Sequence, residues 1–261
     1  MRDPGGPATV LALLLLETAV GGLAVLLATP LWGKVRWGFY KLAGATIFAC
    51  AVLGVLAIRE PLLREPVPSS TRAAFILLIV FTGLVALWQI LVYAKRYPAA
   101  RVIGTVGAAA GVAGLLAIGL DPATTNARPI AIAQLFAGAL FAGAVLDGLL
   151  LGHWHLVDRR LSTTPIARLN QYWLVGCLAV IATVLLALGA PTEADPGISP
   201  LLAAGDLVVW LAAGLSVLCL VIGLFIRALV REGSIQSATG LFYLGVLMGF
   251  AAEFAAKVKF F

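Results

Sequence analysis

Residues 138–160 read GALFAGAVLDGLLLGHWHLVDRR, an apolar stretch that carries Asp147 and then both histidines of the chain. Small residues recur in it at helical spacing, and it ends in two arginines. About 20 apolar residues are enough for a helix to cross the hydrocarbon core of a bilayer. The stretch therefore predicts a transmembrane helix, with its few polar side chains turned toward other parts of the protein.

The composition of the whole chain agrees with this interpretation. Hydrophobic residues make up 62% of it and charged residues 11%, and the mean hydropathy is +1.05. Because so few charged residues cannot cover the surface of a water-soluble protein, the composition predicts an integral membrane protein with lipids as partners. The formal charge of +6 comes from short basic clusters between apolar runs, which indicates membrane topology and no nucleic-acid partner.

Hydropathy predicts an all-α, polytopic membrane protein with eight transmembrane helices. The expected spans are 8–31, 38–58, 73–94, 101–120, 129–156, 169–190, 204–227 and 236–256. Starts and loop lengths of the first four spans recur in the second four. The spacing predicts two four-helix bundles, over residues 1–121 and 122–261, related as a parallel repeat within one membrane domain.

Basic residues predict the orientation. Eleven of the eighteen follow the first, third, fifth and seventh spans: Lys34, Arg36, Lys41, Lys95, Arg96, Arg101, Arg159, Arg160, Arg168, Arg227 and Arg231. The positive-inside tendency places that face in the cytoplasm, so both termini are expected outside a bacterial-type plasma membrane. Tryptophan and tyrosine also gather at this boundary, which predicts an interfacial belt: Trp32, Trp37, Trp88, Trp154, Trp173, Tyr40, Tyr93, Tyr97 and Tyr172.

Three carboxylates fall within the spans, namely Glu17, Asp147 and Glu253. A charged side chain at the bilayer centre costs about 2.5–3.5 kcal/mol on insertion scales, so such groups face protein or water and often mark function. Each continues an i, i+4 row of small residues, which favours contact with another helix. The structural alternative is a hydrogen bond to a neighbouring helix, or, for Glu253 near the outer end of its span, contact with water.

The two histidines define the expected ligand site. His153 and His155 lie about 200° apart around a helix, so they cannot converge on one metal or ligate one haem from both faces. No intrinsic cofactor and no metal site is therefore expected. A titratable imidazole near Asp147 and beside Trp154 suits a quinone head group, with Asp147 as proton donor or acceptor and Glu17 extending the proton path. The alternative is that the two imidazoles lie at the membrane interface and bind no ligand.

These features support three hypotheses about function. The first is a subunit of an energy-transducing, electron-transfer complex that binds quinone or quinol and conducts protons, with other membrane and redox subunits as partners. The second is a proton-coupled transporter of small solutes or ions that uses the same carboxylates. The third is a structural, lipid-binding subunit without chemistry of its own. Whether the chain is itself an enzyme stays open.

Overall fold

The computed structural model describes residues 7–29, 31, 34–64, 69–120, 128–158, 160–188 and 205–260. Within them the chain forms eight helices and no strand: α1 (Pro7–Ala28), α2 (Trp37–Arg64), α3 (Ser69–Tyr93), α4 (Tyr97–Gly119), α5 (Arg128–Val157), α6 (Thr164–Leu186), α7 (Gly205–Arg231) and α8 (Ile235–Phe260). All eight are long and apolar enough to cross a membrane. The predicted class, an all-α polytopic membrane protein, is confirmed.

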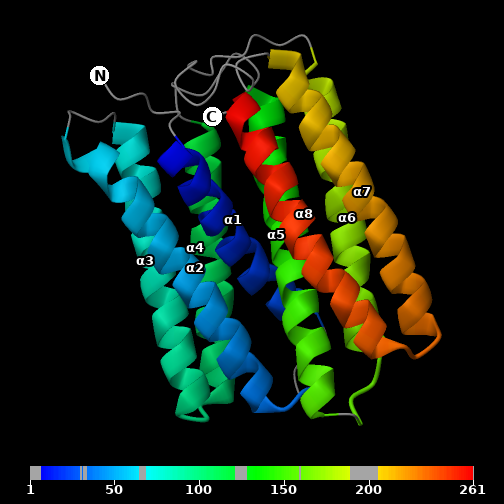
Figure 1. The fold of residues 1–261 in the computed structure, drawn as a ribbon. Coiled ribbons are helices and arrows are strands. Elements are labelled where there is room, and N and C mark those ends of the chain that lie inside the picture. Colours follow the sequence, from blue (N-terminus) through cyan, green and yellow to red (C-terminus); the bar gives the residue numbers. More distant parts are fainter. Residues whose placement is uncertain are drawn as a thin grey trace.

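Short turns make α3 and α4, and likewise α7 and α8, antiparallel neighbours. Lys95, at a φ of 59°, lies in the turn between α3 and α4, and Gly233, at a φ of 80°, lies in the turn between α7 and α8. Proline stands at the start of α4 and of α6, where its missing N–H costs no helical hydrogen bond. The start of α1 and the end of α8 lie at one end of the bundle (Figure 1). We call this the terminal end, and the opposite end, which carries Lys34, Arg36 and Lys95, the basic end.

The helices contact one another in two closed rings. In the first ring α1 touches α2, α2 touches α3, α3 touches α4 and α4 returns to α1. The second ring repeats these contacts with α5, α6, α7 and α8. The rings meet mainly where α1 packs on α5, with α1 also touching α8 and α4 touching α5 (Figure 1). This pattern is the one that two parallel four-helix bundles would produce, although common repeat ancestry of 1–121 and 122–261 stays a prediction.

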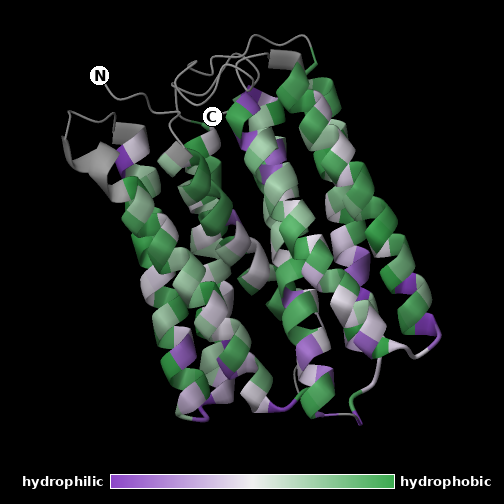
Figure 2. Ribbon diagram, viewed as in Figure 1, coloured by the Kyte–Doolittle hydropathy of each residue, from purple (hydrophilic) through white to green (hydrophobic). Residues whose placement is uncertain are grey.

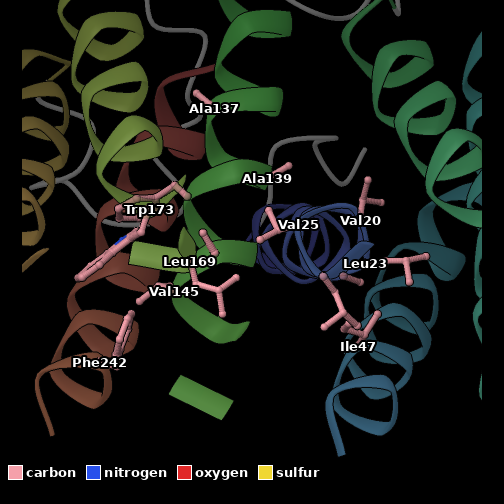
Figure 3. Packing of buried hydrophobic residues seen from close by; sticks show 14 of the residues in the cluster. Val20, Leu23, Val25, Ile47, Ala137, Ala139, Val145, Leu169, Trp173 and Phe242 are labelled. Carbon is pink, nitrogen blue, oxygen red and sulfur yellow. The ribbon is translucent and has the colours of Figure 1, made fainter. Parts of the chain in front are cut away.

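The crossing of α1 and α5 is built from residues that lack bulk. A Cβ on Gly21 would overlap the carbonyl oxygen of Ala139, and a Cβ on Gly143 would overlap the backbone of Gly21 and Gly22. Glycine at these positions lets the two backbones touch, as in many membrane helix pairs. Figure 3 shows α1 end-on between the packed side chains of both rings, with Ala139 of α5 beside it. Helix α1 therefore lies at the centre of the molecule.

The outer surface of the helices is apolar, as a lipid-facing surface must be. Ile90, Phe225 and Leu247 are each more than 60% exposed, at 62%, 61% and 65%. Hydropathy colouring shows polar residues concentrated at the basic end and on part of α8 (Figure 2).

Three of the nine residues expected in the aromatic belt lie in the protein core. Trp88, Trp173 and Tyr40 are fully buried, so these three are core residues and not interfacial ones. Trp173 packs beside Phe141 and Phe242 in the second ring. Their bulk outweighs their preference for the interface because glycines on facing helices leave room for large rings. Trp32 lies outside the described residues, as do the outer loops 65–68, 121–127 and 189–204.

The predicted end of the last span is wrong. We expected it near residue 256, whereas α8 continues to Phe260 and buries both Lys257 and Lys259. Hydropathy ends a span where lysines begin because it scores each charge alone. Here an opposite charge on the same helix and another on a different helix compensate Lys257. Lys257, which lies beyond the expected boundary, is thus part of a buried group of charged side chains.

Candidate functional site

Four polar side chains meet in the interior where α1, α5 and α8 come together. Lys257 Nζ lies 2.8 Å from Glu17 Oε1 and 3.1 Å from Glu253 Oε2. Lys257 also donates a hydrogen bond to Gln134 Oε1, and Gln134 Nε2 donates to Glu253 Oε2 at 3.3 Å. All four residues are fully buried. We call Glu17, Gln134, Glu253 and Lys257 the charge cluster.

Helix geometry brings these side chains together. Glu253 and Lys257 are four residues apart and so share one face of α8. A Cα–Cβ bond tilts toward the N-terminus of its helix, which turns Lys257 away from the nearby end of α8 and into the protein. On α1, which runs the opposite way, the same tilt turns Glu17 toward Lys257. The last and the first helix of the chain thus aim opposite charges at each other.

Gly138 of α5 provides the space for this meeting. A Cβ there would lie 2.5 Å from Glu253 Oε2, 2.8 Å from Glu17 Oε2 and 3.0 Å from Lys257 Nζ. No side chain larger than hydrogen fits without moving charged atoms. Gly138 lies one turn along α5 from Gln134, so α5 contributes both a hydrogen-bonding side chain and an open position to the cluster.

The cluster holds more acidic than basic groups. When all three are ionised, two carboxylates and one ammonium leave one negative charge, which is expensive in the protein interior. Among the described residues, Glu17 Oε2 and Glu253 Oε1 have no hydrogen-bond partner. A cluster with one excess negative charge and two vacant acceptor atoms is suited to take up one proton.

Asp147 is buried at a different position, away from the charge cluster. It is fully buried, and within the described part of the chain neither of its carboxylate oxygens has a hydrogen-bond partner. It lies beside Gly22 of α1, where a Cβ would be 3.8 Å from Asp147 Oδ1. At a rise of about 1.5 Å per residue, Asp147 lies about 13 Å along α5 from Gly138. The structure therefore separates Asp147 from Glu17, the other residue predicted to transfer protons.

The three residues predicted to hold a quinone differ in exposure and in their contacts. His153 is exposed, whereas His155 is buried. Nδ1 of His155 lies 3.0 Å from the carbonyl oxygen of Leu151, and Nε2 lies 3.3 Å from that of Ser162. Trp154 packs on Gly38 and near Phe39 of α2. Opposite directions for the histidines match the helical geometry predicted, and quinone binding itself stays a prediction.

The sequence interpretation missed two members of the cluster, Gln134 and Lys257. The available signal was the four-residue spacing of Glu253 and Lys257, which identifies a helical pair even at the end of an apolar run. Contact with water was one of the alternatives left open for Glu253, and the structure instead buries it completely. Among the described residues no group of histidine, cysteine, aspartate or glutamate could hold a metal ion.

No protein-family model, curated protein or solved structure matches this chain. The buried polar residues and the helices that carry them are therefore the features that bear on function.

Proposed function

We propose that this protein is a proton-coupled transporter of small solutes or ions, in which the charge cluster takes up and releases the coupling proton. The observation that carries the proposal is a fully buried ion pair, Glu17 with Lys257, that joins the two rings of helices beside a second buried carboxylate, Glu253. Buried ionisable groups in membrane spans are costly and commonly belong to ion or proton pathways.

Proton uptake at Glu17 changes how the rings attract each other. With Glu17 ionised, its carboxylate attracts Lys257 across the junction of α1 and α8. A proton on Glu17 removes that attraction and leaves Lys257 paired with Glu253 of its own helix. Because Lys257 keeps its partner Glu253, a proton on Glu17 leaves a neutral cluster and removes only the attraction between the two rings, which biases their relative position. Protonation and movement are thereby linked.

The same proton chemistry would serve a subunit of an energy-transducing complex with a quinone site at His153, Trp154 and His155 and with Asp147 as the proton-transferring acid. The two proposals differ in what accompanies the protein. Mass spectrometry of material purified in mild detergent separates them, because stoichiometric redox subunits favour the complex and a lone homo-oligomer favours the transporter.

Infrared difference spectroscopy across a pH titration tests whether the cluster exchanges a proton. Protein in lipid vesicles should show a carboxylic-acid C=O band that appears on acidification, and Glu17→Gln should remove or shift it. Glu232→Gln, at an exposed residue of the basic end, is the matched control and should leave the band unchanged. A spectrum in which neither Glu17→Gln nor Glu253→Gln alters any titrating band would overturn the proposal.

A further inference from the structure

The oxygens around Lys257 form a complete seat for a primary ammonium group. An ammonium has three N–H donors and no acceptor. Here it meets three oxygens, one each from Glu17, Glu253 and Gln134, at the junction of three helices. The three acceptors come from three different helices, so the seat depends on the tertiary structure and not on Lys257 alone.

The side chain of Lys257 is also close enough to the terminal end of the bundle to extend toward it. It lies three residues before Phe260, the last residue of α8, so the terminal end of the bundle is within one helical turn. Lysine side chains near helix ends commonly extend along apolar surface to place the ammonium in the interface. An inward and an outward position are therefore both within reach of this flexible four-carbon stem.

From this geometry we propose that the seat binds an external monovalent cation of the ammonium type, and that Lys257 occupies the seat until such a cation displaces it. This inference rests on the proposed transporter function and assigns its substrate class. Exchange of one ammonium for another leaves the charge of the cluster unchanged, and Lys257 carries its own charge to the terminal end. The buried carboxylates are then never left without a cation.

The walls of the seat limit what can enter. The position of a Cβ on Gly138 lies 3.0 Å from Lys257 Nζ, so the backbone of α5 directly borders the ammonium. The three oxygens also require N–H donors for their hydrogen bonds. Ammonium and methylammonium satisfy both conditions. Tetramethylammonium carries the same charge but has no N–H and is bulkier, so it should be rejected.

Isothermal titration calorimetry on the full chain in lipid nanodiscs tests the proposal with methylammonium and tetramethylammonium chloride at matched ionic strength. We expect saturable binding of methylammonium to the unmodified protein and none of tetramethylammonium. A tethered competitor acts at an effective concentration on the order of millimolar or above, so Lys257→Ala should tighten methylammonium binding at least about tenfold. Lys95→Ala, which removes an exposed lysine at the basic end, should change nothing.

Glu253→Gln should abolish methylammonium binding, whether or not Lys257→Ala yields folded protein. Equal binding of the two cations, or no methylammonium binding in either the unmodified protein or Lys257→Ala, overturns the ammonium seat. The outcome is separable from that of the proton proposal. A titrating infrared band without methylammonium binding removes the seat alone, and methylammonium binding without a titrating band removes proton coupling alone.

Discussion

Replacing Gly138 by alanine should disrupt the charge cluster although no charged residue is replaced. The new Cβ would lie 2.5 Å from Glu253 Oε2, 2.8 Å from Glu17 Oε2 and 3.0 Å from Lys257 Nζ. Ordinary contact begins near 3.4 Å, so the Glu253 oxygen must retreat by about 0.9 Å, which is large compared with the tolerance of a close-packed interior.

The cost follows from how the cluster responds. Overpacking a core by one methyl group costs about 1–3 kcal/mol when neighbours can shift. If the retreat of Glu253 or Glu17 breaks contact with Lys257, the loss approaches the roughly 3–5 kcal/mol expected for a broken buried ion pair. We therefore expect Gly138→Ala to lower the free energy of unfolding by about 1–5 kcal/mol, with the upper part of that range indicating a broken pair.

Denaturant unfolding in detergent micelles measures the change, and two other glycines provide controls. A Cβ on Gly83 of α3 or on Gly214 of α7 would meet no atom within 4 Å. Alanine at those positions should be neutral or slightly stabilising, because alanine favours a helix over glycine. In a background with Glu17→Gln, Glu253→Gln and Lys257→Met, the cost of Gly138→Ala should fall. Equal stability of Gly138→Ala and Gly83→Ala would refute the packing argument.

Three further predictions concern other residues. Arg36 Nε lies 3.2 Å from Asp158 Oδ2 with 80% of the arginine side chain exposed, so Arg36→Gln should change the unfolding free energy by no more than about 1 kcal/mol, and a larger loss by the same denaturant assay would contradict a solvated pair. Asp147→Asn should also lower the free energy of unfolding by less than about 1 kcal/mol, since no described residue hydrogen-bonds its carboxylate. If Asp147 transfers protons, this folded variant should lose about 10²-fold or more in turnover, and unchanged turnover would assign Asp147 a structural role. In a background without the three native cysteines, Lys95→Cys should react with impermeant maleimide only from the cytoplasmic side and Leu120→Cys only from outside, and the reverse labelling would invert the proposed topology.

The membrane spans could be predicted because each is a local property of the sequence. Apolar length and basic clusters require no knowledge of which helix touches which, and each of the eight expected spans coincides with one helix, with every boundary agreeing to within about six residues. The burial of Glu17 against α5 could also be predicted, since Gly21 one turn away marks the helix-facing side. Each of these patterns involves residues of a single helix.

The charge cluster could not be predicted in the same way, because its members come from three helices. Nothing local to Gln134 indicates that it will meet Lys257, and Lys257 alone reads as the flank of a span. The sequence analysis grouped Asp147 with Glu17 in one expected proton path, whereas Asp147 lies beside Gly22 of α1 and apart from Glu17. Long-range pairing of polar residues depends on tertiary contacts that periodicity does not contain.

The pairing of the first helix with the last has a consequence for biogenesis. A ribosome delivers Glu17 to the membrane long before Lys257 is synthesised, so the newly inserted α1 must wait in the bilayer with an uncompensated carboxyl group. Only the arrival of α8 completes its environment. Chains released before α8 would leave Glu17 without its ammonium partner, so the stable packing of α1 should depend on the synthesis of α8.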